Sequence, residues 1–182
     1  MPAPADSSAG PVLFVAVSGP PGSGKSTLAQ ELATQLTLPL VAKDAIKEAL
    51  MTVLAVPDVA ASREAGRAAM AILLRIAGSC PTGAVLEANF QRTKARTELQ
   101  RLPGQLVEVF CSCPRQVCIA RYRVRARSRA AGHLDADRSD DEIWNEEVSR
   151  PVAGGWPVLE VPTDGPVDVP RLVAAVRELQ QA

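Results

Sequence analysis

The stretch from Gly19 to Thr27 constrains this chain more than any other. It reads GPPGSGKST and matches the pattern G-x-x-x-x-G-K-[ST]. Glycines let a backbone take positive φ angles and wrap closely around a ligand. The amide groups of such a loop form a nest for anions, and the following helix adds its partly positive N-terminus. The pattern therefore predicts a phosphate-binding loop (P-loop). In it, Lys25 would reach the outer phosphates of a nucleotide and the Ser26 hydroxyl would ligate Mg²⁺.

The residues on either side of the loop fit this interpretation better than a chance Gly/Pro-rich turn. Residues 12–17 form a continuous apolar run, typical of a strand that is buried on both faces of a parallel sheet. After the loop, Leu28, Leu32 and Leu36 recur at helical spacing. We therefore expect a strand, a loop and a helix in succession. The residues expected to contact the nucleotide here are Gly19, Gly22, Ser23, Gly24, Lys25, Ser26 and Thr27.

Length and composition indicate a single soluble domain. The chain has 182 residues, of which 47% are hydrophobic and 22% charged. A domain of this size buries about 70% of its unfolded surface. Its 20 basic and 20 acidic residues leave no net charge, which argues against nonspecific binding to nucleic acid. We expect a disordered leader at 1–10, with no features of a secretory signal, and one domain at 11–182. No apolar run reaches the roughly 20 residues that span a bilayer, so we expect no membrane contact.

The four cysteines give no sign of a metal centre. Cys80, Cys111, Cys113 and Cys118 form no C-x-x-C pair and match no zinc-binding spacing. We expect buried free thiols in a reducing compartment, in keeping with a cytoplasmic protein.

Apolar runs alternate with helical patterns along the rest of the chain. The expected strands are 12–17, 39–42, 84–86, 105–111 and 157–161. The expected helices are 26–36, 45–54, 60–79, 93–102, 114–130, 139–149 and 169–180. This alternation predicts an α/β fold with a parallel sheet and right-handed crossovers. Ligands in such folds bind beyond the carboxyl ends of the strands. Polar residues follow the strands there, and we expect those near Asp44 and Glu87 to converge with the loop.

Asp44 is the candidate general base. It lies between a short strand and a helix, where it could accept the proton of an attacking hydroxyl group. It could also serve as a plain helix N-cap. Lys47, one turn further on the same face, is expected either to hold an anionic or hydroxylated substrate or to be a solvated lysine.

Glu87 ends an otherwise apolar strand, where an unpaired carboxylate would be costly to bury. It could hold Mg²⁺ through water, contact substrate hydroxyls or pair with an arginine. Asn89 and Arg92 lie next on the same loop and are further candidates for binding the substrate.

The densest charge cluster of the chain is a run of arginines. Arg121, Arg125 and Arg129 lie four residues apart and share one helix face, beside a stripe of Val117 and Val124 that we expect to face inward. Inward arginines can clamp phosphates and neutralise charge in a transition state. Arg123 and Arg127 should point elsewhere. The alternative, favoured for Arg123 and Arg127, is a solvated basic helix that pairs with Asp140, Asp141, Glu146 and Glu147. His133, the only histidine, falls in a loop where surface or lid docking is favoured over catalysis.

Together, Gly19–Thr27, Lys43–Lys47, Glu87–Phe90 and Arg121–His133 resemble the small P-loop kinases of the AAA_33 and zeta-toxin-like group. Relatives in that group include chloramphenicol phosphotransferase, gluconate kinase and the polynucleotide kinase domain. The resemblance implies a five-stranded parallel sheet of order 2-3-1-4-5 and an arginine-bearing lid at about 121–138. It also implies that Asp44 is the substrate-hydroxyl base, and it places Arg121 and Arg125 near the adenine and phosphates.

We therefore expect an enzyme that uses ATP and Mg²⁺ to phosphorylate a hydroxyl group of a small molecule such as a sugar, an antibiotic or another metabolite. Lys25, Asp44, Arg125 and Arg129 would be its catalytic residues. A nucleotide or polynucleotide 5′-hydroxyl kinase is the alternative, although the neutral charge opposes it. A nucleotide-dependent regulatory binding protein is the alternative from another class. Residues 51–76 and 90–96, rich in Ala, Val and Leu, predict a small and partly apolar acceptor pocket.

Overall fold

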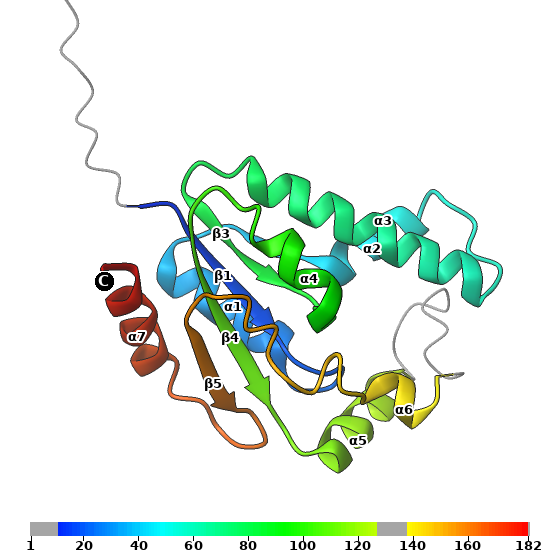
Figure 1. Ribbon diagram of the computed structural model, residues 1–182. Coiled ribbons are helices and arrows are strands. Elements are labelled where there is room, and N and C mark those ends of the chain that lie inside the picture. Colours follow the sequence, from blue (N-terminus) through cyan, green and yellow to red (C-terminus); the bar gives the residue numbers. More distant parts are fainter. Residues whose placement is uncertain (1–10, 127–137, 182) are drawn as a thin grey trace, which may run out of the picture.

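The computed structural model describes residues 11–126 and 138–181 and centres on one parallel sheet (Figure 1). Its five strands are ordered β2-β3-β1-β4-β5, which confirms the predicted order. They are β1 (Leu13–Ser18), β2 (Leu40–Ala42), β3 (Gly83–Glu87), β4 (Gln105–Ser112) and β5 (Val158–Pro162). The central strand β1 pairs with β3 and β4 and is buried along its whole length. The leader expected at 1–10 lies outside the described residues.

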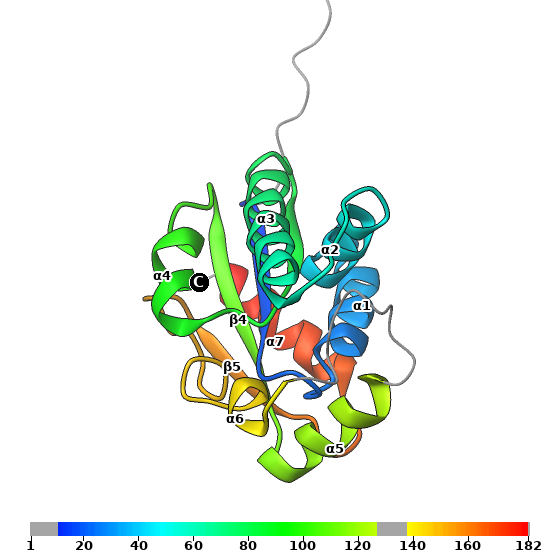
Figure 2. The same ribbon diagram turned by 90° about the vertical axis from the view of Figure 1, so that its right-hand side faces the viewer.

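Helices cover both faces of the sheet (Figure 2). On one face, α1 (Lys25–Leu36) and α7 (Val169–Gln181) pack against the odd-numbered residues of β1. On the other face, α3 (Val59–Gly78) and α4 (Arg92–Leu99) pack against Phe14 and Ala16. The alternation of side chains along β1 thus supplies two separate apolar cores, as expected for a strand buried on both faces. Among the described residues, no helix combines the length and apolar character needed to cross a membrane.

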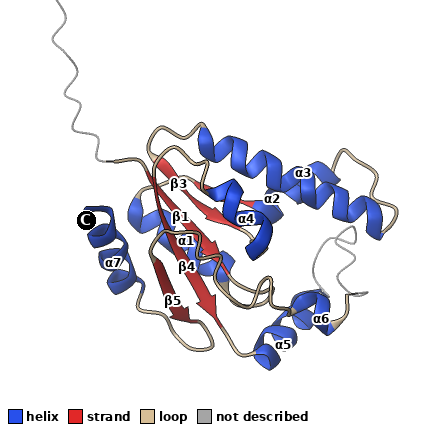
Figure 3. Cartoon of the chain, viewed as in Figure 1, coloured by secondary structure: helices blue, strands red, loops and turns tan. Residues whose placement is uncertain are grey.

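The remaining helices lie near the carboxyl ends of the strands. They are α2 (Lys43–Met51), α5 (Arg115–Ala126) and α6 (Asp140–Ile143). Figure 3 shows the four longer strands pointing toward the edge at which α5 and α6 lie. The helix expected at 139–149 was too long, because α6 ends at Ile143. Its predicted capping box is present, since Ser139 and Glu142 exchange side-chain and backbone hydrogen bonds.

A buried carboxylate ties β4 to the connection that leads into β5. Glu108 is fully buried, and its Oε1 atom accepts hydrogen bonds from Ser18 Oγ at 2.6 Å and Val152 N at 2.8 Å. Its Oε2 atom accepts from Ala153 N at 2.9 Å and Trp156 Nε1 at 3.1 Å. Four hydrogen bonds satisfy a group that would otherwise be costly to bury. Because Ser18 is the last residue of β1, this network also anchors the chain at the start of the glycine-rich loop.

Candidate active site

The glycine-rich loop between β1 and α1 has the backbone conformation that its sequence predicts. Gly19, Gly22 and Gly24 have φ angles of 134°, 81° and 90°, in the region that L-residues rarely adopt. Gly24 is the N-cap residue of α1, and its carbonyl accepts the first helical hydrogen bond, from Leu28 N at 3.2 Å. The loop therefore delivers the chain directly into a helix N-terminus, where anions are favoured.

Neighbouring backbone also requires two of these glycines to lack a side chain. A Cβ atom at Gly19 would lie 2.7 Å from the carbonyl oxygen of Cys111, and one at Gly22 would overlap the carbonyl oxygen of Cys118. The end of β4 and the first turns of α5 thus lie against the loop. Burial raises the pKa of both the Cys111 and the Cys118 thiol to about 12, so these cysteines are neutral packing groups here. All four cysteines are free thiols, and those at 111, 113 and 118 are buried as expected, whereas Cys80 is partly exposed.

Two polar side chains inside the loop fit a phosphate ligand. Lys25 is 5% exposed, and its Nζ atom donates a hydrogen bond to Pro20 O at 2.8 Å. Burial lowers the pKa of Lys25, while the nearby carboxylates of Glu87 and Asp44 act to raise it. The Ser23 hydroxyl is buried and has no hydrogen-bond partner among the described residues. A lysine and an unsatisfied hydroxyl beside a helix N-terminus form a cradle suited to phosphate oxygens.

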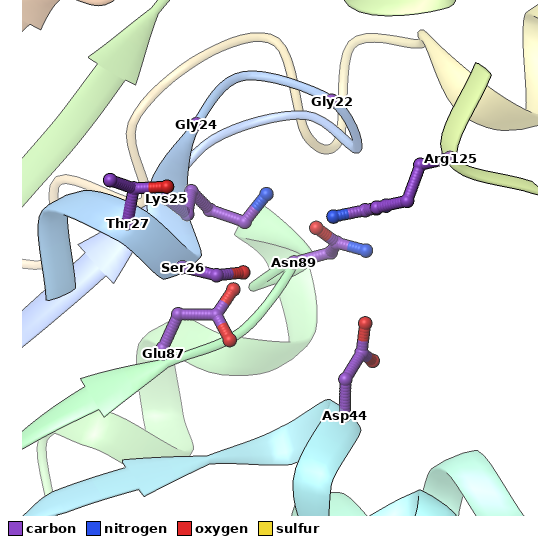
Figure 4. Close-up of a pocket in the computed structure, with 9 residues that line it drawn as sticks. All are labelled: Gly22, Gly24, Lys25, Ser26, Thr27, Asp44, Glu87, Asn89 and Arg125. Atoms are coloured by element: carbon purple, nitrogen blue, oxygen red, sulfur yellow. The ribbon is translucent and has the colours of Figure 1, made fainter. Parts of the chain in front are cut away.

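A cavity of about 70 Å³, which we call the phosphate cavity, opens at the mouth of the loop (Figure 4). Three of its residues come from other elements: Asp44 from α2, Glu87 from the end of β3 and Arg125 from α5. Asn89 lies just after β3. The remaining lining residues are Gly22, Gly24, Lys25, Ser26 and Thr27. The predicted convergence of Asp44, Glu87 and Asn89 on the loop is therefore observed. Asp44 is not the N-cap residue of its helix, since Ala42 has that role and makes no side-chain hydrogen bond.

Glu87 and Ser26 form the part of this cavity that suits a metal ion. Glu87 is 5% exposed, and burial raises its pKa, while Lys25 acts to lower it and so does a hydrogen bond with the Ser26 side chain. Figure 4 shows the Glu87 carboxylate beside the Ser26 hydroxyl. The described residues contain no cluster of three or more His, Cys, Asp or Glu side chains able to hold a metal alone. One hydroxyl and one carboxylate fit Mg²⁺, which keeps several waters and takes its other ligands from substrate phosphates.

A second, larger cavity of about 870 Å³ adjoins the first, and we call it the outer cavity. The two cavities share Asp44, Asn89 and Arg125. Side chains of α2, α3, α4 and α5 line the outer cavity, with residues 138–148 closing it. Its charged lining residues are Lys43, Asp44, Lys47, Arg63, Arg67, Lys94, Glu98, Arg125, Arg138 and Glu142. The expectation of a small pocket was therefore wrong, because this cavity is large and α3 and α4 turn charged side chains toward it. Its partly apolar character is as expected, since Val59, Met70 and Ala95 also line it.

Of the two expectations for Lys47, the solvated lysine was wrong. It is 8% exposed, and its Nζ atom donates a hydrogen bond to Ser62 Oγ on α3 at 2.8 Å. Both residues line the outer cavity. The guanidinium of Arg125 lies 6.0 Å from the centre of the buried Tyr122 ring, at the outer limit of a cation–π contact. Two cations of the site are thus held by neighbouring side chains.

Other predicted residues lie elsewhere. Arg121 lines neither cavity, because its guanidinium donates to Thr163 O at 2.8 Å and Asp164 O at 3.3 Å. The exposed residue Arg92 begins α4 and also lines neither cavity. Arg129, Arg127 and His133 lie outside the described residues, as does most of the expected lid. Arg123 points away from the cavities and pairs with Asp140 at 2.9 Å, as its spacing indicated.

The orientation of α5 also differs from the expected one. Val124 is 68% exposed, whereas Cys118 and Tyr122 are the buried residues of this helix. Sequence reasoning missed the basic wall that α3 and α4 contribute to the outer cavity. The signal for α3 was the pair Arg63 and Arg67, which lie four residues apart and therefore on one helical face.

The sheet order, the glycine-rich loop and the cavity at its mouth define the fold of the P-loop NTPases. The AAA_33 family model, an AAA domain, matches residues 14–145, and the chain belongs to this family. The comparison with curated proteins gives no match.

Several solved structures that resemble the chain are described as kinases. One is a protein of Chloroflexus aurantiacus described only as a proposed kinase, with 27% identity and a TM-score of 0.79 over 91% of this chain and 97% of that one. The APS kinase CysC of Mycobacterium tuberculosis, bound to AMPPNP and APS, has 21% identity and a TM-score of 0.61, covering 95% and 99%. The shikimate kinase of Acinetobacter baumannii, bound to shikimate, has 20% identity and a TM-score of 0.59, covering 91% of each chain.

Proposed function

We propose that this protein is an ATP-dependent phosphotransferase that moves the γ-phosphoryl group of ATP to a hydroxyl group of a small molecule. One observation carries the proposal: the phosphate cavity and the outer cavity meet at Asp44, Asn89 and Arg125. A nucleotide held by the P-loop would direct its last phosphate toward these residues. The outer cavity, whose volume is within the range of small-molecule sites, would hold the acceptor on the far side.

Residues at this junction and in the phosphate cavity would have separate chemical tasks. The acceptor oxygen forms a bond to the γ-phosphorus while the bond between that phosphorus and the bridging β–γ oxygen breaks, and ADP leaves. The Asp44 carboxylate accepts the proton of the acceptor hydroxyl. Lys25 and Arg125 neutralise charge on the transferring group. Ser26 and Glu87 would hold Mg²⁺, which supplies further neutralisation of the phosphates. The predicted contribution of Arg129 remains a prediction from the sequence.

The test of this proposal is the variant Asp44→Asn. It keeps the shape of the side chain and removes the proton acceptor, so phosphoryl transfer should fall by about 10²–10⁴-fold. Nucleotide affinity, measured by calorimetry, should change little because the P-loop is intact. The matched control is Asp58→Asn. Asp58 is an exposed N-cap residue of α3 outside both cavities, and asparagine caps equally well.

Transfer should be followed with γ-labelled ATP against a panel of sugars, sugar acids, antibiotics, nucleosides and a 5′-hydroxyl oligonucleotide. Labelling of one small-molecule class by the wild type, lost in Asp44→Asn, would support the proposal. Unchanged transfer in that variant would refute the role of Asp44. Labelling of the oligonucleotide alone would favour a polynucleotide kinase. Tight nucleotide binding without any acceptor-dependent turnover would favour a regulatory binding protein.

A further inference from the structure

The outer cavity has a strong local excess of positive charge. Its described lining contains seven basic side chains and three acidic ones. The whole chain, in contrast, has equal numbers of basic and acidic residues. The excess is therefore a concentration of cations at one place and not a property of a basic protein. Such a concentration inside a concave site raises the local potential and attracts anions.

The three acidic groups of the described lining offset only part of this positive charge. Glu142 forms an ion pair with Arg63 at 2.8 Å and is also held by the capping box of α6. Asp44 lies at the junction with the phosphate cavity, where it has the proposed task of accepting a proton. Glu98 is the one remaining acidic residue of the described lining. Apart from the Arg63–Glu142 pair, the described lining contains six basic and two acidic side chains.

The most buried of these cations is Lys47. Its hydrogen bond to Ser62 joins α2 to α3 and fixes the ammonium group in the cavity wall. Lys47 is only 8% exposed, so an anionic ligand group beside it would be largely shielded from water, where a charge-assisted hydrogen bond is strong. Arg67 lies five residues, about one and a half turns, along α3 from Ser62 and also lines the outer cavity.

The spacing along α2 limits the size of the ligand. Asp44 and Lys47 are three residues apart on one helical face, so their backbones are about 4.5 Å apart along the helix axis. A hydroxyl group placed at Asp44 and an anion placed at Lys47 are therefore separated by only a few bonds. The phosphates of a nucleotide and the Asp44 carboxylate would also repel an anionic acceptor unless cations surrounded it.

We propose that the acceptor bears an anionic group, a carboxylate or a phosphate monoester, which binds against Lys47 and Arg67 while its hydroxyl group faces Asp44. This inference rests on the proposed phosphotransferase function and specifies the class of its acceptor. The acceptor is a small hydroxy acid or sugar phosphate and not a neutral sugar or an apolar antibiotic.

The first experiment needs no knowledge of the acceptor. The protein is saturated with Mg²⁺ and a non-hydrolysable ATP analogue, so that the P-loop is filled, and inorganic phosphate is titrated by calorimetry. Lys47→Met and Arg67→Gln should each raise the dissociation constant of phosphate by about tenfold or more, as expected for loss of a charge-assisted contact. The matched control is Arg75→Gln, an exposed arginine two turns further along α3 that lines neither cavity. It should stay within twofold of the wild type.

If Lys47→Met fails to fold, Arg67→Gln still tests the inference, because Arg67 is exposed. The absence of phosphate binding to the nucleotide-loaded wild type would overturn the anion site, as would binding unchanged in every variant that folds. Neither result would touch the kinase proposal, which nucleotide binding and transfer measure separately.

The second experiment distinguishes carboxylate from phosphate. Transfer from γ-labelled ATP is compared for matched acceptors: glucose with gluconate and with glucose 6-phosphate, and glycerol with glycerate and with glycerol 3-phosphate. A higher kcat/KM for the anionic members supports the inference and names the anion. An equal or higher kcat/KM for the neutral members overturns it while leaving the kinase intact. Phosphate binding as expected, with no transfer to any acceptor, would support the anion site and count against the kinase.

Discussion

The buried carboxylate of Glu108 allows a stability prediction to be worked out atom by atom. In Glu108→Gln the side chain keeps its length, but one oxygen becomes an NH₂ group that cannot accept a hydrogen bond. If the amide oxygen replaces Oε2, the bonds from Ala153 N and Trp156 Nε1 survive. The NH₂ group then replaces Oε1 and can donate to Ser18 Oγ, but it faces the amide proton of Val152, which is left without an acceptor. The opposite orientation leaves two donors unsatisfied.

The unsatisfied donor sets the cost of the substitution. One buried, unsatisfied N–H group costs about 1–3 kcal/mol, and loss of the charge on the surviving bonds adds about 1 kcal/mol. We therefore expect Glu108→Gln to lower the free energy of unfolding by about 2–4 kcal/mol. For a domain of this size that corresponds to a fall in Tm of about 4–16 °C.

Urea unfolding followed by circular dichroism measures this loss, with equal m-values as the check that the unfolded state is unchanged. Glu160→Gln is the control, because Glu160 is exposed on the neighbouring strand β5, paired with Phe110, and should change the stability by no more than about 0.5 kcal/mol. A loss below about 1 kcal/mol for Glu108→Gln would refute the reasoning.

Two further predictions concern the phosphate cavity. Burial raises the pKa of Glu87, so the folded protein binds the proton of this carboxyl group more tightly than the unfolded chain does. The free energy of unfolding should therefore fall as pH rises from 4.5 through the raised pKa of the folded state. The fall should be at most about 1.4 kcal/mol per pH unit. Glu87→Gln should remove this contribution from unfolding curves recorded across that range; an unchanged slope would contradict it. Gly22→Ala should abolish nucleotide binding in calorimetry, because the new methyl group would overlap Cys118 O. Gly155→Ala, also at a positive φ but with open space around it, should cost only about 1–2 kcal/mol of stability and leave nucleotide affinity unchanged; equal affinities in both variants would contradict the steric argument.

The sheet and the phosphate cavity could be predicted because their signals are local. A run such as 12–17 is apolar throughout only if both faces of a strand are buried, and the loop motif requires a helix directly after it. The rule that ligands meet the carboxyl ends of parallel strands then sufficed to bring Asp44, Glu87 and Asn89 together. The sequence could not show that Asp44 lies inside the first turn of α2. Because β2 runs directly into α2, no turn residue marks which position is the N-cap.

The helix expected at 139–149 ended early because tertiary contacts prevailed over its helical pattern. Glu147 accepts hydrogen bonds from Thr93 N and Thr93 Oγ1, and its carbonyl oxygen accepts one from Arg92 N. These bonds hold residue 147 against the N-terminus of α4. The partners lie more than fifty residues away in the sequence, so no local pattern could indicate them.

The buried state of Lys47 was hidden for the same reason. Its hydrogen-bond partner Ser62 lies on α3, fifteen residues further along the chain. In the sequence, a lysine between isoleucine and glutamate looks like part of a solvated helical face. Only the packing of α2 against α3 turns it into the wall of a cavity.

The shared wall of the two cavities has a consequence for how the ligands would bind. Asp44, Asn89 and Arg125 face both spaces, so a ligand on either side changes the charge and hydrogen bonding that the other side meets. Binding free energies that are coupled in this way are reciprocal: whatever factor the nucleotide contributes to acceptor affinity, the acceptor returns to the nucleotide. The free energy of the complex with both ligands is therefore the same whichever ligand binds first. The order of addition affects only the rates and the concentrations of the intermediate complexes.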